Sequence, residues 1–366
     1  MSSLPEEIYR DILLRLPGKS LVSCKYVCKS WYELISDPSF IKSHLNLTNQ
    51  RNSYRLMFEC DEMNSVNSIS YDSLSSSEKY DDAVAVEMDF SNTISKCRSE
   101  ILGSCNGLVY GLNNKLKFFF LWNPATKEHK RLPKSPDTYY GSTFHGFGYD
   151  YKADDYKLVL VRDICESFRV QVYSLKSNSW KSFETIQRYG MGTYYVTYSG
   201  VFLNRVLHWP GRPGNKIVTM NISEEGLEVL KLPITDYEFM SIGVLEGCLC
   251  VLSDHVGKTF EVWVMPDYGV QESWTKLYSI GFGRRKYHSS MVELLVSFKN
   301  GKILFKNEPI GDGKNSVFLY DPQYKTARKL NITGLNDGEA FSYYESLVSL
   351  KCSTLGKRKR EKSIET

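Results

Sequence analysis

The sequence predicts a mainly β protein that begins with a short helical module. Aromatic residues make up 13% of the 366 residues, with 25 Tyr and 18 Phe, and such side chains suit the half-buried surfaces of pleated sheets. Beyond residue 47, short apolar runs alternate with Gly, Asn, Asp and Pro, a pattern typical of strands joined by turns. Residues 4–45 instead carry apolar side chains at helical spacing. We therefore expect one large β domain with a helical appendage.

The helical module is predicted to contain three helices. The first carries apolar residues four positions apart: Leu4, Ile8, Ile12 and Leu16. Pro17-Gly18 ends it, and the second helix covers the apolar pattern from Leu21 to Ile35, which Asp37-Pro38 ends. Residues 39–45 form a short third helix. Because about 40 residues bury little surface on their own, the module needs a partner surface or the rest of the chain.

A weak repeat runs through the β region. Each copy has an upstream hairpin, an apolar strand and then a polar turn, and equivalent points are Asn123, Ser174, Asn221, Met265 and Asp321. They lie 51, 47, 44 and 56 residues apart, close to the repeat of four-stranded propeller blades. A further blade can form from strands near both ends, such as Tyr54–Phe58 and Phe341–Leu350. Sharing a blade closes the ring and removes edge strands, so we expect a β-propeller-like domain of about six blades.

Charge and cysteine content restrict the partners and the compartment. The net charge is +4, and residues 351–366 carry all of this surplus. A neutral body argues against nucleic-acid binding, which requires a basic face. No apolar run is long enough to span a membrane, no secretory signal opens the sequence, and the nine Cys are an odd number. The chain is expected in the cytoplasm, the nucleus or both, with reduced thiols; Lys357–Arg360 fits either a nuclear import signal or a solvated tail.

Candidate chemical groups are few. Gly103–Gly107 places Cys105 in a sequence like a nucleophile elbow, but a strand follows where a helix is required, so a hairpin turn is expected. Cys248 and Cys250 share one face of a strand, which favours core packing. The six His are scattered, and no metal, phosphate-binding or dinucleotide motif is present. We expect no catalytic residue, no metal and no cofactor.

Two parts of the sequence resemble known families. Leu4-Pro5-x-x-Ile8, Leu16-Pro17, Val27-Cys28-Lys29-x-Trp31 and Asp37-Pro38 resemble an F-box over residues 4–45. The body resembles the plant F-box-associated (kelch-like) domain over residues 95–350. The residues that carry this second resemblance are Gly103–Leu108, Leu121–Thr126, Gly146–Asp150 and Asp154–Lys157.

The resemblance implies a substrate receptor of an SCF (Skp–cullin–F-box) ubiquitin ligase, with no catalysis of its own. The F-box would bind the Skp adaptor, and through it the cullin and RING subunits, while the second domain presents a protein target for ubiquitination and proteasomal degradation. The implied division is residues 1–46, 47–352 and a basic tail, 353–366. The implied adaptor contacts are Leu4, Pro5, Ile8, Leu16, Pro17, Val27, Cys28 and Trp31. Some apolar residues, notably Leu13 and Leu34, can instead only hold the helices together.

Candidate target contacts come from clusters rich in aromatic and cationic residues, the types that dominate binding energy. They are Tyr189, Tyr194, Trp209, Arg212, Arg284, Arg285 and Tyr287. Ordinary blade packing and solvated turns explain the same residues. Two other functions remain open, a non-degradative scaffold or inhibitor and an enzyme acting through Cys105. Under the hypothesis of a ubiquitin-ligase substrate receptor, the motifs do not distinguish turnover of immune receptors from pollen self-incompatibility.

Overall fold

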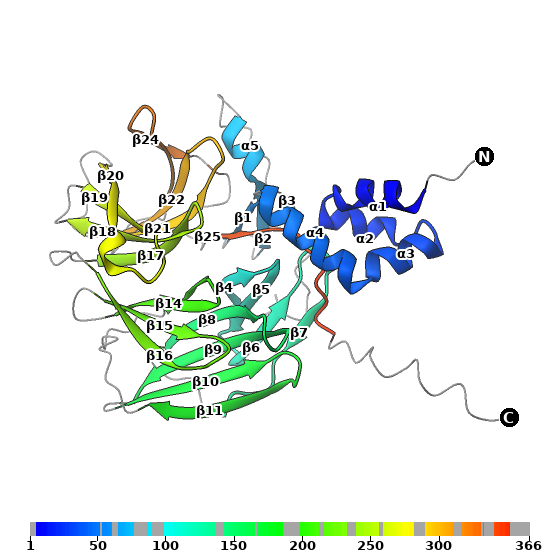
Figure 1. Ribbon diagram of the computed structural model, residues 1–366, viewed down its shortest axis with the longest axis horizontal. Helices are drawn as coiled ribbons and strands as arrows, with labels where there is room; N and C mark the ends of the chain where they lie inside the picture. The colour runs from blue at the N-terminus through cyan, green and yellow to red at the C-terminus, as the bar shows by residue number, and fades with distance from the viewer. Residues whose placement is uncertain are drawn as a thin grey trace.

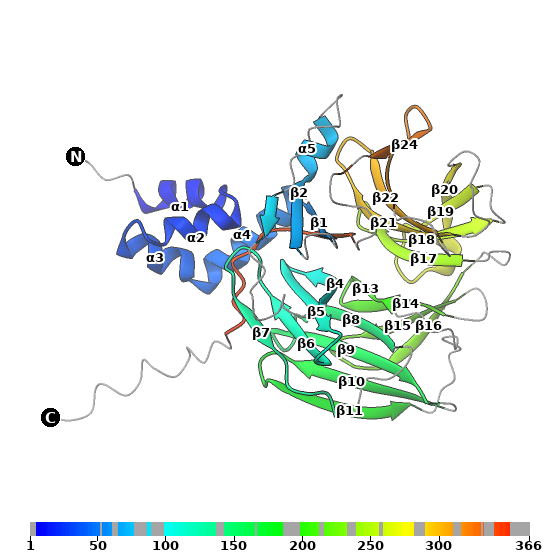
Figure 2. The same ribbon diagram turned by 180° about the vertical axis from the view of Figure 1, so that it is seen from behind.

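The computed structural model shows a bundle of helices beside a ring of β-sheets (Figures 1 and 2). It describes residues 5–51, 53–60, 65–76, 86–88, 99–136, 143–164, 167–185, 198–211, 216–232, 239–255, 259–281, 290–309, 316–330, 332 and 340–351. Among these residues, no helix combines the length and the hydropathy that a membrane crossing requires.

Four helices precede the first strand of the described chain: α1 (Glu6–Leu14), α2 (Gly18–Cys24), α3 (Lys29–Ser36) and α4 (Pro38–Arg51). The prediction of three helices is wrong, because a turn at residues 25–28 divides the expected second helix. The backbone of Cys28 is extended (φ −159°, ψ 166°), a conformation that ends a helix. α4 is longer than predicted, and Asp37 caps it by accepting hydrogen bonds from the backbone N–H groups of Ser39 and Phe40.

The described strands form six sheets around a common axis, which confirms the prediction of about six propeller blades. Blade 1 contains β4 (Ser99–Cys105), β5 (Leu108–Asn113), β6 (Phe118–Trp122) and β7 (His129–Arg131). Blade 2 contains β8 (Thr143–Asp150), β9 (Asp155–Asp163), β10 (Phe168–Ser174), β11 (Ser179–Thr185) and the parallel strand β12 (Tyr198–Ser199). Blade 3 contains β13 (Val201–Leu203), β14 (Val206–Gly211), β15 (Lys216–Asn221) and β16 (Leu227–Lys231).

The second half of the ring has the same plan. Blade 4 contains β17 (Phe239–Leu245), β18 (Cys248–His255), β19 (Thr259–Met265) and β20 (Thr275–Ile280), with the 3-10 helix η2 (Gln271–Ser273) before β20. Blade 5 contains β21 (Ser290–Ser297), β22 (Ile303–Pro309), β23 (Ser316–Asp321) and β24 (Thr326–Leu330). Blade 6 contains β25 (Ala340–Tyr343), β1 (Arg55–Cys60), β2 (Ser65–Ser70) and β3 (Val86–Met88), with helix α5 (Tyr71–Ser76) after β2.

Blade 6 closes the ring as predicted, by joining strands from both ends of the chain. β25 pairs antiparallel with β1, with Tyr343 opposite Arg55 and Ala340 opposite Phe58. The strand from the C-terminal side ends at Tyr343, although the expected range extended to Leu350. Residues 344–350 leave the sheet and run to the helical bundle.

The strand pairing gives the propeller two unlike edges. β25 ends and β1 begins at the edge beside the helices, which we call the proximal edge. The turns β4–β5, β8–β9, β13–β14, β17–β18 and β21–β22 lie at the same edge, because the first strands of neighbouring blades run in the same direction around the axis. The opposite ends of these strands form the distal edge.

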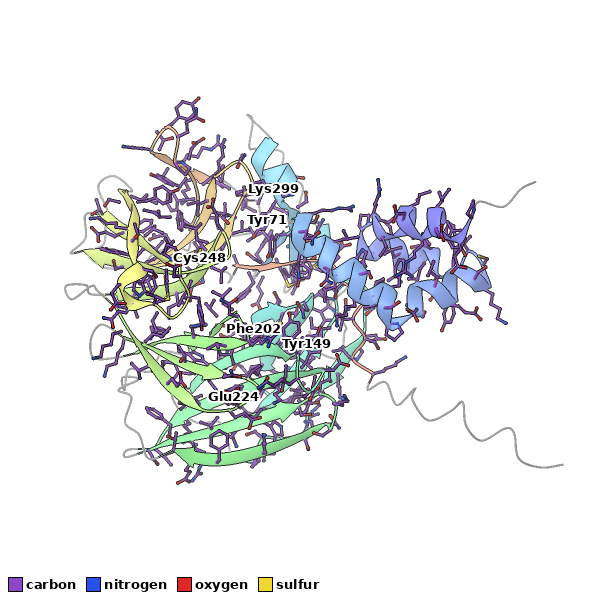
Figure 3. All side chains as sticks on the ribbon, viewed as in Figure 1. Tyr71, Tyr149, Phe202, Glu224, Cys248 and Lys299 are labelled. Atoms are coloured by element: carbon purple, nitrogen blue, oxygen red, sulfur yellow. The ribbon has the colours of Figure 1, made fainter. Side chains whose placement is uncertain are left out.

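Apolar side chains fill the spaces between blades (Figure 3), and separate apolar clusters lie between neighbouring blades. Every junction also carries a hydrogen bond between blades. In order around the ring, these are Ser104 Oγ to Ser342 O, Tyr110 Oη with His145 Nδ1, Trp209 Nε1 to His145 O, Tyr268 Oη with His208 Nε2, Ser241 Oγ to Val292 O, and Ser342 Oγ to Leu295 O. These bonds fix each blade against the next, because a buried polar group that loses its partner is costly.

The junction between blades 3 and 4 allows a direct test. Burial lowers the pKa of His208 to about 4, so the ring is neutral. Its Nδ1 lies 3.0 Å from Val201 O and donates to it, and Nε2 therefore accepts from the Tyr268 hydroxyl at 2.8 Å. Tyr268→Phe should lower the free energy of unfolding by about 1–3 kcal/mol, because a buried acceptor loses its donor. Urea denaturation measures this, with the exposed Tyr324→Phe as control; equal stability of the two variants would contradict it.

Candidate functional site

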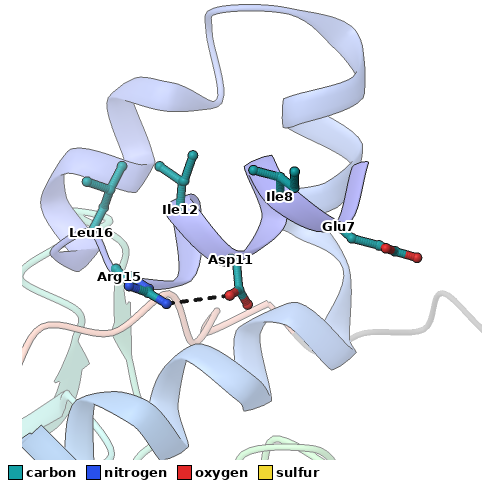
Figure 4. A pocket seen from close by; sticks show the side chains of 6 residues that line it. All are labelled: Glu7, Ile8, Asp11, Ile12, Arg15 and Leu16. Carbon is teal, nitrogen blue, oxygen red and sulfur yellow. Dashed lines mark ion pairs between the residues drawn. The ribbon is translucent and has the colours of Figure 1, made fainter. Parts of the chain in front are cut away.

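The outer face of α1 exposes a stripe of apolar side chains. Ile8 and Ile12 are 48% and 51% exposed, and they lie in line with Leu16 on one side of the helix (Figure 4). The four-residue spacing places the three side chains one above another. A shallow groove there is lined by Glu7, Ile8, Asp11, Ile12, Arg15 and Leu16. Two half-exposed Ile on adjacent turns indicate a surface that another protein covers.

Charged groups flank this stripe. Asp11 and Arg15 form an ion pair at 3.5 Å with both side chains exposed (Figure 4), and Glu7 lies one turn earlier. An exposed pair of this kind contributes little to stability. In protein interfaces in general, such pairs at a polar rim set orientation and specificity around an apolar centre.

A second exposed region lies at the turn between α2 and α3. Tyr26, Val27 and Cys28 are all exposed there, because the turn directs their side chains away from the bundle. Pro5 and Pro17 are also exposed, and each directly precedes a helix. The turn therefore adds apolar surface to that of α1.

The predicted adaptor contacts thus fall into three groups. Pro5, Ile8, Pro17, Val27 and Cys28 are exposed. Leu16 and Trp31 are half-buried and pack on the bundle core, and Leu4 lies outside the described residues. The exposed Ile12 and Tyr26 were absent from the predicted set. The spacing Ile8-Ile12-Leu16 could have identified Ile12, whereas the exposure of Tyr26 depends on the unpredicted turn.

The bundle core explains the half-buried contacts. Leu13, Leu21, Ile35 and Phe40 are fully buried, and the rings of Tyr9 and Trp31 lie 6.5 Å apart. The burial of Leu13 supports the alternative that it only holds the helices together.

Two cysteines that the sequence analysis singled out, Cys28 and Cys105, have thiol pKa values shifted in opposite directions. Hydrogen bonds from the backbone of Trp31 and from the Ser30 hydroxyl lower the pKa of Cys28. Burial raises the pKa of Cys105 to about 12. Cys105 precedes a hairpin turn between β4 and β5, where Asn106 and Gly107 have φ of 52° and 78°. The predicted hairpin is confirmed, and the buried thiol is unsuited to act as a nucleophile.

The other candidate sites are structural or lie outside the described residues. Within the described chain, no group of three or more His, Cys, Asp or Glu could hold a metal ion. Burial raises the pKa of Cys250 to about 12, in agreement with core packing. In the Gly146–Lys157 region, Lys157 Nζ lies 2.8 Å from Asp150 and 3.1 Å from Glu225, so these charges join blades 2 and 3.

One predicted target contact is wrong. Trp209 was expected in an exposed loop, but it lies in β14 with no exposed surface. Its Nε1 donates to His145 O at 2.9 Å, so its indole serves the junction between blades 2 and 3. The other predicted target contacts, Tyr189, Tyr194, Arg212, Arg284, Arg285 and Tyr287, lie outside the described residues. The strand ends that flank all of them are at the distal edge.

Comparison with known proteins supports both resemblances seen in the sequence. Residues 55–353 match the model of the F-box associated beta propeller domain, and residues 1–43 match that of the F-box domain. F-box protein CPR1 of Arabidopsis thaliana is 34% identical over 343 residues, which cover 84% of this chain and 80% of that protein. F-box/kelch-repeat protein At3g23880 of the same plant is 28% identical over 330 residues, covering 83% of this chain and 87% of that protein.

Thiol labelling tests the geometry of the exposed turn. At neutral pH, iodoacetamide should modify Cys28 at least tenfold faster than Cys105 or Cys250, because the exposed thiol has the lowered pKa and the buried thiols have raised ones. Mass spectrometry of peptides after timed quenching gives the rates. Comparable rates for Cys28 and Cys105 in the folded chain would contradict this placement.

Proposed function

This chain belongs to the F-box proteins with an F-box-associated β-propeller domain, and we propose that it is the target-recognition subunit of an SCF-type ubiquitin ligase. The observation that carries this proposal is the exposed apolar stripe on α1, which is the surface a Skp adaptor would cover. The bundle would bind the adaptor, and through it the cullin and RING subunits. The propeller would bind a protein target.

The adaptor interface would have an apolar centre and a polar rim. Ile8, Ile12 and the exposed part of Leu16 form the centre, and Val27 extends it across the α2–α3 turn. Burial of one apolar side chain contributes about 1.5–3 kcal/mol when it goes from full exposure to full burial. Two half-exposed Ile therefore supply about 2 kcal/mol between them, enough for each to affect affinity measurably.

The proposed mechanism is proximity. The protein would hold a target near a ubiquitin-charged enzyme that the cullin and RING subunits recruit. Tethering raises the effective concentration of the target lysines. Cys105, the one thiol with an elbow-like sequence, is buried with a raised pKa, in keeping with a receptor that performs no bond chemistry.

The target would bind at the distal edge of the propeller. The bundle lies beside the proximal edge, so a distal target would leave the adaptor surface free. Tyr189, Tyr194, Arg212, Arg284, Arg285 and Tyr287 remain the proposed contacts, since their types suit binding hot spots and their flanking strands end at this edge. Target choice would then depend on connecting segments, which carry specificity on a rigid scaffold.

Charge placed on the α1 stripe should weaken adaptor binding without unfolding the protein. Ile12→Asp should weaken Skp-adaptor binding by tenfold or more, because it puts a carboxylate in the apolar centre of the interface. Leu116→Asp is a matched control, since Leu116 is 53% exposed at a propeller turn. Isothermal titration or co-purification with a recombinant Skp adaptor measures the effect.

The proposal fails if Ile12→Asp and Leu116→Asp bind the adaptor equally well, or if a chain lacking residues 1–45 retains binding. Cys28 gives an independent readout on the unmodified chain. Adaptor binding should slow its alkylation, because the α2–α3 turn is part of the proposed adaptor interface.

A further inference from the structure

Residues 344–350 connect the propeller to the helical bundle from the far end of the chain. After β25 ends at Tyr343, Tyr344–Leu350 leave the sheet without forming a strand or helix. We call this segment the strap. In Figures 1 and 2 it passes between blade 1 and the bundle.

The strap completes the core of the helical bundle. Leu347 is 2% exposed and belongs to the same cluster as Leu13, Leu21, Ile35 and Phe40. Glu345 Oε2 accepts a hydrogen bond of 2.9 Å from the backbone N–H of Lys19, which is 326 positions away in the sequence. A side chain from the C-terminal side thus occupies the centre of an N-terminal module that is too small to build a full core.

The propeller holds the strap by its backbone. Asn123 is fully buried, and its Nδ2 donates to Ser346 O at 3.1 Å and to Val348 O at 2.7 Å. The Asn123 Oδ1 accepts from Ala125 N at 2.9 Å, so its own turn orients the amide. One side chain thereby fixes two residues of the strap.

Two more groups of blade 1 receive the strap. Glu128 Oε2 accepts hydrogen bonds from Leu350 N at 2.7 Å and from Ser349 Oγ at 2.9 Å. Gly107 lies against it so closely that an added Cβ would be 2.5 Å from Ser346 Oγ and 2.7 Å from Tyr344 O. The strap therefore binds to the motifs Gly103–Leu108 and Leu121–Thr126. The proposed function gives these two motifs no other role.

We infer that the F-box of this protein is a composite module, in which Leu347 completes the core and Asn123 and Gly107 hold the strap that supplies it. The inference deepens the proposed function and rests on it for its consequence. A chain that has every F-box motif but lacks residues 344–350 would bind the Skp adaptor poorly. Recruitment of the ligase would then be restricted to chains whose propeller has closed. Asn123 and Gly107 are positioning residues, since they act on the adaptor surface through the strap.

A matched pair of glycine variants separates strap contact from backbone strain. Gly107 and Gly247 occupy equivalent hairpin turns with φ of 78° and 81°, each after a residue with φ of 52° or 51°. A Cβ at Gly107 meets the strap, whereas a Cβ at Gly247 meets nothing within 4 Å. Gly107→Ala and Gly247→Ala in the full chain thus share the strain of a positive φ, and only the first displaces the strap.

Hydrogen–deuterium exchange of backbone amides measures the local stability of the helical bundle directly. Gly107→Ala should speed exchange in α1–α3 by about tenfold or more relative to Gly247→Ala, with β14 and β15 as internal reference strands. Leu347→Ala should have the same effect, since it removes atoms from the core cluster of the bundle, which contains no residue of blade 1. Adaptor affinity should fall by a similar factor in both variants, and the exposed Lys351→Ala should change neither quantity.

Unchanged exchange in α1–α3 for Leu347→Ala would overturn the inference, as would equal exchange for Gly107→Ala and Gly247→Ala. Should Gly107→Ala unfold the whole chain, Leu347→Ala alone decides. The failure of the proposed function looks different: the unmodified chain would not bind the adaptor, while the exchange differences would persist.

Discussion

The antiparallel pairing of β25 with β1 is the contact on which the rest of the molecule depends. It joins strands from opposite ends of the chain, with Tyr343 opposite Arg55, and it builds the blade that fills the gap between blades 5 and 1. Closing so long a loop costs conformational entropy that grows only slowly with length, whereas an open ring would expose two edges to aggregation. The same pairing brings the segments before β1 and after β25 to the proximal edge. The helices before β1 and the strap after β25 are neighbours for this reason alone.

Buried polar groups give the ring its fixed geometry. Each junction combines apolar packing with a hydrogen bond that crosses between blades, for example Tyr110 with His145 and Ser104 with Ser342. Burial lowers the pKa of His145 to about 3, so the ring stays neutral at physiological pH and can join such a bond without burying charge. Asp150 shows the other solution. Its burial favours the neutral form, but hydrogen bonds from Lys157 and Ser223 outweigh that effect and lower its pKa to about 2, so it remains an ionised partner for Lys157.

The features that could be predicted from the sequence are those with local or periodic signals. Blade spacing, the closing blade and the Asn106-Gly107 hairpin follow from strand patterns and turn residues. The break at residues 25–28 could not be predicted, because the apolar period of Leu21–Ile35 continues across it and no Gly or Pro marks the turn. Trp209 was misplaced for a similar reason. Pro210 and Gly211 next to it are typical of loops, yet the indole is buried because His145 O provides a partner 64 positions away. The apolar stripe on α1 could be predicted in large part, since its residues repeat along one helix, and its role as an adaptor surface stays a prediction.

The most distinctive motifs of the β domain have a structural role, which is to bind the strap and to join neighbouring blades. Asn123 and Gly107 contact the strap, and the Gly146–Lys157 region supplies an ion pair between blades 2 and 3. Residues that identify the family are thus occupied with its architecture, and they carry no information on which protein is bound. None of these motifs falls in the segments that distal strand ends flank. Under the proposed function, such a propeller could vary its distal segments while the strap holds the adaptor surface in one orientation. The distance between adaptor and target would then depend on the rigid framework, and the identity of the target would depend on the distal segments.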